Sequence, residues 1–168
     1  MNVAGRLLAT VIPFLLICLS GSMLTGCDKE LSVETPGVSV GPIDPSNQRE
    51  FVRQMVGTYL LLSNELQNQY QQFKATDDAD GFVLYRNNHW TPEYIANKSA
   101  YEKRFYEQKA YIYRHQLDGL FDLFFGLHKL SVHLKHSLLE KDWKLEQQVL
   151  QKLTADQAAV NRYLLVAP

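Results

Sequence analysis

Apolar residues recur at spacings of three and four over most of the chain after residue 46, which is the pattern of an α-helix with one buried face. The first such stripe consists of Val52, Met55, Tyr59, Leu62, Leu66 and Phe73. Gln69 fills its single gap, and the opposite face carries Asn, Gln and Arg. Asp44-Pro45 or Ser46 offers a cap in front of it. We therefore predict a first helix that ends near Lys74.

The longest stripe consists of Tyr106, Ala110, Tyr113, Leu117, Leu120, Phe124, Leu127, Ser131, Leu134 and Leu138. Thr91-Pro92 is a helix-start signal ahead of it, and no proline interrupts it. These features predict one long central helix over residues 92–139, which would be about 72 Å long. Gly119 and Gly126 are candidate breaks, with Gly119 the stronger. The stripe stays in phase across both, so we expect a continuous or gently kinked helix.

A second apolar set lies on another face of the same segment and consists of Tyr94, Tyr101, Phe105, Tyr111 and Ile112. Tyrosine combines a rigid ring with a hydroxyl donor and is enriched at binding surfaces. We take these five residues as a candidate interaction face. The alternative is that their rings pack the wet edge of a helical bundle.

Lys141-Asp142 interrupts the pattern, and a last helical face follows it. This face consists of Trp143, Leu150, Leu153, Val160 and Leu164, with Leu145 and Val149 beside it. Thr154 and Gln157 match a capping box, which either starts a new short helix or lies inside a longer one. The predicted fold class is all-α, a three- or four-helix bundle over residues 47–168 with one long central helix.

Residues 75–90 break the helical pattern, and we predict an irregular loop there. Counted from Thr76, Asp78 and Asp80 fall at ligand positions of an EF-hand, followed by a glycine at the sixth position. The twelfth position is Asn87, so the bidentate carboxylate that completes such a Ca²⁺ site is missing. An ordinary solvated interhelix loop is the alternative.

His133, His136 and Glu140 share one helix face, a spacing that can present nitrogen and oxygen ligands to Zn²⁺. The spacing is not that of the HExxH motif, and no general base lies between the histidines. A polar, partly solvated surface is the alternative. We therefore predict no metal site and no bound cofactor, and keep these three residues, with Asp78 and Asp80, only as secondary candidates for metal ligands.

The sequence has no GxSxG elbow, no P-loop and no glycine-rich phosphate turn, so we predict that the protein is not an enzyme. Cys18 and Cys27 are its two cysteines, and both lie near the amino terminus, which leaves the helical domain without a thiol. Basic and acidic residues nearly balance, at 17 and 18, and form no long block of one sign. This balance gives no support to a nucleic-acid partner.

The first 27 residues have the organisation of a secretory signal peptide. Arg6 precedes an apolar run over residues 7–19, which is shorter than the roughly 20 residues needed to span a bilayer. Small residues follow, and then Leu24, Thr25, Gly26 and Cys27. These four residues resemble the lipobox of bacterial lipoproteins. The resemblance implies diacylglycerol on the Cys27 thiol, cleavage before Cys27 so that residues 1–26 are lost, and an N-acyl chain on the new terminus.

The resemblance also implies a periplasm-facing location in the bacterial envelope, with multiple acyl chains as a firm membrane anchor. Asp28 favours the inner membrane, and the outer membrane remains the alternative. Residues 27–46, rich in proline and glycine, then form a lipid anchor and flexible linker. We expect a non-enzymatic accessory, assembly, exclusion or immunity component that binds an envelope protein or forms a homo-oligomer. A periplasmic sensor that binds a small ligand or a metal is the alternative.

Overall fold

The computed structural model describes residues 41–166, and all regular elements in this range are helices. They are α1 (Gln48–Ala75), α2 (Ala79–Tyr85), the π-helix η1 (Arg86–Trp90), α3 (Thr91–Glu107), α4 (Lys109–Arg114), α5 (Asp118–Leu139) and α6 (Trp143–Val166). The predicted all-α class is therefore confirmed. Over these 126 positions, no helix combines the length and the hydropathy needed to cross a bilayer.

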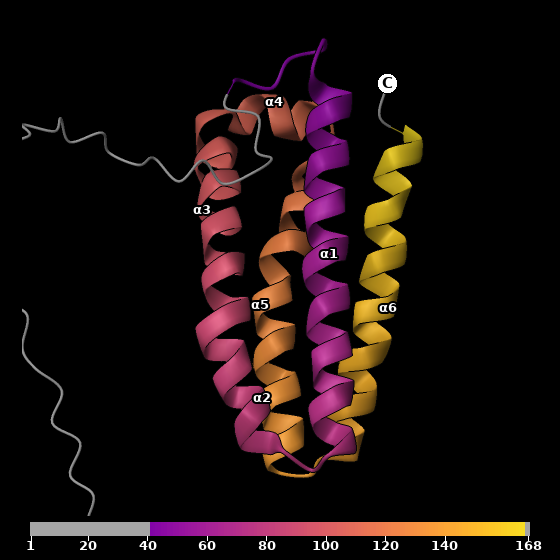
Figure 1. Ribbon diagram of the computed structural model, residues 1–168. Helices are drawn as coiled ribbons and strands as arrows, with labels where there is room; N and C mark the ends of the chain where they lie inside the picture. Colours follow the sequence, from indigo (N-terminus) through magenta and orange to yellow (C-terminus); the bar gives the residue numbers. More distant parts are fainter. Residues whose placement is uncertain (1–40, 167–168) are drawn as a thin grey trace, which may run out of the picture. The chain divides into compact units, whose positions relative to one another are not determined.

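Four long helical segments lie side by side and alternate in direction along the chain (Figure 1). α1 runs away from the end at which α4 lies, and α2, η1 and α3 together run back to it. α4 crosses that end, after which α5 runs down and α6 returns. We call the two ends the α4 end and the opposite end, which holds the turns at residues 76–78 and 140–142.

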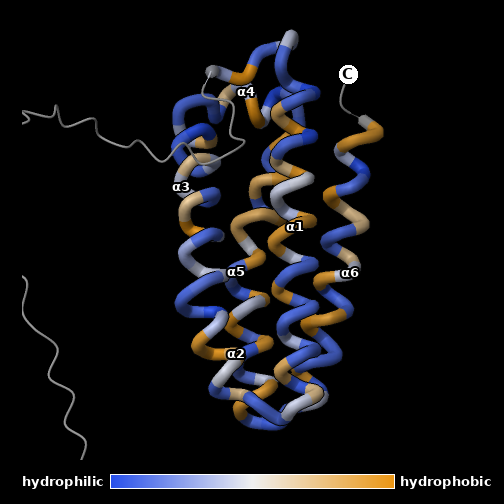
Figure 2. The backbone as a smooth tube through the Cα atoms, viewed as in Figure 1, coloured by the Kyte–Doolittle hydropathy of each residue, from blue (hydrophilic) through white to orange (hydrophobic). Residues whose placement is uncertain are grey.

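Aromatic rings fill much of the interior between these segments. Phe124 of α5 stacks on Tyr94 of α3 with ring centroids 5.9 Å apart and meets Tyr101 edge-on at 4.8 Å. The α1 stripe is buried from Val52 to Leu66, as predicted. Figure 2 shows hydrophobic positions recurring along each of the four segments. Because each buried aromatic ring removes a large apolar area from water, these rings contribute much of the stability.

Most of residues 75–90 are helical, so the predicted irregular loop is wrong. Asp78 caps α2 by accepting a hydrogen bond from the Gly81 N–H at 2.8 Å. The Trp90 indole N–H donates to the Leu62 carbonyl at 2.9 Å, which ties η1 to α1. Helical backbone continues from residue 79 to residue 107, and Thr91 lies inside this run instead of capping a new helix.

The π turn keeps one face of this segment directed inward. Its buried positions Phe82, Arg86, Trp90 and Tyr94 recur every four residues. In an α-helix with 3.6 residues per turn, each such step overshoots a full turn by about 40°. Three steps would rotate the face by about 120° away from the core. A π turn closes i→i+5 hydrogen bonds, holds more residues per turn and absorbs this drift.

The predicted continuous helix over residues 92–139 is wrong, because the chain leaves the α-helical path at Gln108 and again at residues 115–117. Ile112 and Leu117 are both buried although they lie five residues apart, a spacing that does not suit one face of an α-helix. Tyr106, Ala110 and Tyr113, assigned to the stripe, are exposed. From Leu117 onward the stripe is buried as predicted, at Leu117, Leu120, Phe124, Leu127, Ser131, Leu134 and Leu138.

Three tight turns end a helix with a non-glycine residue in the left-handed region: Asp77 (φ 52°), Gln116 (φ 55°) and Lys141 (φ 52°). In each, the next residue donates its N–H back to the carbonyl five positions earlier, at 2.9, 3.0 and 2.9 Å respectively. This is the Schellman motif, in which glycine usually takes the left-handed position. No glycine occupies that position here. The breaks in the apolar pattern nevertheless predicted the first and third turns, after Lys74 and at Lys141-Asp142, whereas the turn at Gln116 was missed.

α6 buries part of the predicted face, at Leu153 and Val160, but its buried side is rotated from the predicted one. Trp143 and Leu164, assigned to the apolar face, are exposed, whereas Glu146 and Asp156 point inward between buried Val149, Leu153 and Val160. Lys74 reaches Glu146 Oε1 at 2.5 Å, and Lys152 pairs with Asp156. The two carboxylates are tolerated inside because each has a cationic partner. The capping-box residues lie within this helix, which is the second of the two alternatives for them.

Candidate functional site

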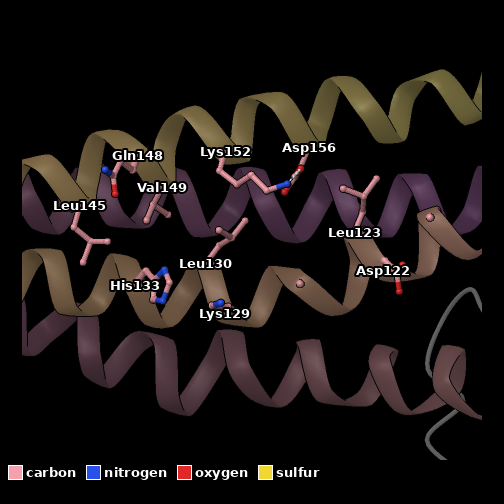
Figure 3. Close-up of a pocket in the computed structure, with 12 residues that line it drawn as sticks. Asp122, Leu123, Lys129, Leu130, His133, Leu145, Gln148, Val149, Lys152 and Asp156 are labelled. Atoms are coloured by element: carbon pink, nitrogen blue, oxygen red, sulfur yellow. Dashed lines mark hydrogen bonds and ion pairs between the residues drawn. The ribbon is translucent and has the colours of Figure 1, made fainter.

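A groove of about 590 Å³ runs along the outer side of the α5–α6 pair. Its apolar floor comes from both helices: Leu145 and Val149 point from α6 toward α5, and Leu123 and Leu130 point from α5 toward α6 (Figure 3). Its polar rim consists of Asp122, Lys129, His133, Gln148, Lys152 and Asp156. We call this feature the α5–α6 groove. An apolar floor between polar rims suits an amphipathic ligand or helix.

Two glycines on α5 create the space for the groove. Gly119 and Gly126 both line it and are seven residues apart, so they lie on the same helix face. A Cβ added at Gly126 would meet no atom within 4 Å, so the groove is open at its middle. A Cβ added at Gly119 would lie 2.5 Å from the Tyr163 hydroxyl. Tyr163 therefore covers Gly119, and the glycine permits this close approach.

The rim charges are unevenly distributed along the groove. Asp122 and Asp156 lie toward one end in Figure 3, and Lys129 and His133 lie toward the other. Asp156 is only 5% exposed, and its partner Lys152 extends from the solvent side. The groove therefore has an acidic end, near Gly119, and a basic end.

The acidic end also affects α1. Burial, together with the negative charge of Asp156, raises the pKa of the Tyr59 phenol well above its ordinary value. The Tyr59 hydroxyl has no hydrogen-bond partner among residues 41–166. A neutral phenol, unlike a phenolate, can remain near this carboxylate without charge repulsion.

A second polar cluster lies between η1 and α5, centred on Arg86, which is 6% exposed. Its Nε donates to the Ser131 hydroxyl at 3.0 Å, one terminal nitrogen donates to Asn87 at 2.9 Å, and the other lies 3.1 Å from His128 Nε2. No carboxylate pairs with Arg86 among the described ion pairs. Neutral acceptors therefore hold a buried cation in place.

This arrangement requires a particular state of His128. Burial first, and then the charges of Arg86 and Lys98, lower the pKa of the His128 imidazole. A neutral ring can offer Nε2 as an acceptor to Arg86, whereas an imidazolium would present a proton to it. His128 also stacks on Tyr94, with centroids 5.6 Å apart. The cluster therefore joins α3, η1 and α5 and belongs to the packing of the fold.

The predicted metal-ligand candidates do not come together. Asp78 is the cap of α2, and Asp80 lies in the first turn of that helix, so the backbone here is not an EF-hand loop. His136 Nδ1 lies 3.5 Å from Glu140 on the surface, while His133 lines the α5–α6 groove. Within the part of the chain that the structure describes, no three His, Cys, Asp or Glu side chains gather closely enough to hold a metal ion.

The candidate interaction face requires a correction, because its residues are packed inside the domain. Tyr94, Tyr101 and Ile112 are buried, and Phe105 and Tyr111 are partly buried against the core. The alternative that these rings pack the edge of a helical bundle describes their surroundings better. The Tyr94 hydroxyl, for example, donates to the Phe125 carbonyl at 3.0 Å.

Leu24, Thr25, Gly26 and Cys27 lie outside the described residues, as do the signal peptide and most of the linker. The linker prediction extended to residue 46, but Ile43 is buried. The ordered domain therefore begins earlier than predicted.

The groove was missed in the sequence, where its two glycines were considered only as helix breaks. The available signal was a seven-residue repeat of glycine beside a repeat of leucine, at Leu123 and Leu130, on one face of a predicted helix. Such a repeat predicts a shallow, apolar strip. Comparisons of the chain with protein-family models, with curated proteins and with solved structures found no match.

Proposed function

We propose that this chain is a lipid-anchored lipoprotein of the bacterial envelope that binds an amphipathic helix of an envelope protein and catalyses no reaction. The lipobox-like residues 24–27 support the anchor. The four side-by-side segments support the finer description of the domain as a four-helix bundle on an N-terminal tether. The α5–α6 groove is the proposed binding site.

The groove itself is the observation that carries this proposal. It lies on the outer side of two helices, with leucine and valine along its floor and mostly exposed polar residues along its rims. Along α6, its lining extends from Leu145 to Asp156, about 16 Å, which is about three helical turns. A partner helix with apolar residues at i, i+3, i+4 and i+7 would present a matching stripe.

The charges of the groove favour one direction for that helix. A helix carries partial positive charge at its N-terminus and partial negative charge at its C-terminus. Its N-terminus is therefore expected beside Asp122 and its C-terminus beside Lys129 and His133. The bound helix would then run parallel to α5, with a basic side chain near Asp122.

The same geometry argues against catalysis in the groove. Asp122 and His133 are eleven residues apart on α5, or about 16 Å along the helix axis. That separation is too large for the two side chains to act as an acid–base pair on one reacting bond. Asp156 is engaged by Lys152 and lies toward the Asp122 end.

A small-ligand sensor is the second candidate function. The volume of about 590 Å³ falls within the range of roughly 300–1,000 Å³ typical of ligand sites. The two candidates differ in what fills the groove. Release of an apolar small molecule when the purified native protein is denatured, together with the absence of any helical partner, would favour the sensor.

Photo-crosslinking in cells tests the leading proposal. A photoreactive residue replaces Gln148, which lines the groove, or its neighbour Gln147, which does not line it and serves as the matched control. We expect the Gln148 probe alone to crosslink an amphipathic segment of one envelope protein, as identified by mass spectrometry of the linked peptide. Gly126→Leu should abolish this product by filling the groove. Gly57→Leu should not, because Gly57 also has open space around its Cβ position but lies on α1.

Three outcomes would overturn the helix-binding proposal. One is equal crosslinking from both probe positions, and another is a product that survives Gly126→Leu. The third is a crosslink to a second copy of this chain, which would make the groove a homodimer interface.

A further inference from the structure

The chain enters the domain at the α4 end and is fastened there. The Ile43 N–H donates to Gln108 Oε1 at 2.6 Å, and Gln108 Nε2 donates back to the Ile43 carbonyl at 2.9 Å. Ile43 is buried, and Gln108 is the residue between α3 and α4. Gly41 lies 14 positions after Cys27 in the sequence, and a chain of that length spans at most about 50 Å. An anchor on Cys27 would therefore keep the α4 end within that distance of the lipid surface.

The α4 end carries exposed tyrosine and leucine side chains. Tyr106 is 70% exposed and Tyr113 is 51% exposed. Lys109 Nζ lies 5.8 Å from the centre of the Tyr113 ring. Leu164 and Leu165 are also exposed, in the last turns of α6 at the same end (Figure 1). Tyrosine beside lysine is typical of protein surfaces that lie at the boundary between lipid and water.

Charge differs between the two ends. Residues 103–115 at the α4 end hold four basic residues and one acidic residue. Residues 76–80 at the opposite end hold three aspartates and no basic residue. Residues 140–144, in the turn that follows α5, hold two acidic and two basic residues. Residues 44–53, around the first turn of α1, also hold two of each. An anionic lipid surface therefore attracts the α4 end and repels the opposite end.

We propose that the α4 end is a second, non-covalent membrane contact that lies on an anionic phospholipid surface. Tyr106 and Tyr113 enter the interfacial layer, and Lys109 and Arg114 face the lipid phosphates. The inference rests on the lipid anchor of the proposed function and adds an orientation to it. The helices stand upright on the membrane, with the opposite end pointing away.

The test uses the full acylated lipoprotein in vesicles of phosphatidylcholine, with or without phosphatidylglycerol. A diazirine-bearing residue replaces Tyr106 or Tyr113, or, as controls, Leu84 or Leu139, which are exposed apolar residues toward the opposite end. When phosphatidylglycerol is present, we expect at least about fivefold more lipid adducts at the two tyrosine positions than at the two leucine positions. High salt, or vesicles without phosphatidylglycerol, should remove this difference in labelling, because the attraction is electrostatic.

A charge variant separates attraction from simple proximity. Lys109→Gln with Arg114→Gln should remove the dependence on phosphatidylglycerol without shifting the melting temperature, since both residues are exposed. Lys141→Gln with Lys144→Gln is the matched control at the opposite end and should leave the labelling unchanged. Equal labelling at both ends, or labelling that does not depend on lipid charge, would overturn the proposed membrane contact of the α4 end but not the lipid anchor on Cys27. A mass spectrum without acyl chains on Cys27 overturns both.

Discussion

Lys141 Nζ lies 3.1 Å from Asp77 Oδ1, so an ion pair joins the turn after α1 to the turn after α5. Both residues adopt left-handed backbone conformations, at φ 52°. Their side chains are 63% and 78% exposed, and exposed pairs contribute little to stability. The Schellman hydrogen bonds, which satisfy helix-terminal carbonyls, therefore matter more to these turns than the ion pair does.

Gln116→Gly is expected to stabilise the protein. The third Schellman turn places Gln116 at φ 55°, where a residue with a Cβ is disfavoured. Glycine removes that cost at the expense of backbone entropy, for a net gain of about 0.5–1 kcal/mol in the free energy of unfolding. Urea denaturation measures the change. Gln116→Ala keeps the Cβ and should leave the midpoint nearly unchanged, so a similar shift in both variants would contradict the explanation.

Two glycines should respond in opposite directions to alanine. A Cβ at Gly57 has open space, so Gly57→Ala should raise the free energy of unfolding by about 0.5–1 kcal/mol through better helix propensity. A Cβ at Gly81 would lie 2.2 Å from Asp78 Oδ2 and 2.7 Å from the Phe73 ring. Gly81→Ala should therefore cost at least about 1 kcal/mol. Thermal melts of the two variants side by side decide the matter, and equal shifts would count against the described packing.

Leu120→Asp should abolish cooperative unfolding. Leu120 is fully buried on α5, and an unpaired carboxylate there costs at least about 3 kcal/mol. Leu61→Asp is the matched control, because Leu61 is 61% exposed on α1 and should tolerate the charge within about 0.5 kcal/mol. Circular dichroism during heating reports both. A cooperative, unshifted melt of Leu120→Asp would show that this face is not core.

Stability should fall as the pH decreases from 7 to 5 because of His128. The lowered pKa of His128 means that the unfolded chain takes up a proton near pH 6.5, before the folded protein does. Stability is therefore fully present above the unfolded pKa and decreases as the pH drops toward the folded value. His128→Gln keeps an acceptor for Arg86 but does not titrate. Urea midpoints at several pH values should show a smaller slope for this variant, and an identical slope would exclude His128 as the cause.

Cys27→Ala should release the protein from membranes while its helical content stays the same. The proposed anchor depends on the Cys27 thiol, whereas all residues that pack the described domain lie at position 43 or later. Fractionation of cells, followed by circular dichroism of the released protein, tests both parts. If the variant stays fully in the membrane fraction, the lipobox interpretation fails.

The parts of the fold that follow regular periodicity were predictable from the sequence. The α1 stripe and the stripe from Leu117 to Leu138 repeat at helical spacing and are buried as expected. The turns at Asp77 and Lys141 coincide with breaks in that periodicity, but the turn at Gln116 was missed, because the apolar stripe stays in phase across it and no glycine marks its left-handed position. On α6, Leu153 and Val160 were assigned correctly, but Glu146 and Asp156 were missed, because they look like surface residues until Lys74 and Lys152 are placed beside them. Those pairings depend on tertiary structure.

The site was less predictable than the fold. We took the tyrosines as candidate binding residues, because their chemistry suits recognition, yet Tyr94 and Tyr101 are part of the buried core. The α5–α6 groove arises where side chains are missing, at Gly126 above all. An absence of this kind becomes a cavity only when a second helix is packed beside it. The glycine and leucine repeats of α5 indicate an apolar strip, but they do not show that α6 lies beside it.

The π turn at η1 restricts how this protein can change during evolution. Removing one residue from Arg86–Trp90 would place Tyr94 eleven residues after Phe82, and eleven residues of an ordinary α-helix make about three full turns. Phe82 and Tyr94 would then still face the same interior, without a π turn. Substitutions within this stretch can accumulate at exposed Asn87, Asn88 and His89, whereas inserting one residue or removing two would rotate every later position by about 100°. Homologues, however distant in sequence, are therefore expected to place these two aromatic positions twelve residues apart with a π turn, or eleven residues apart without one.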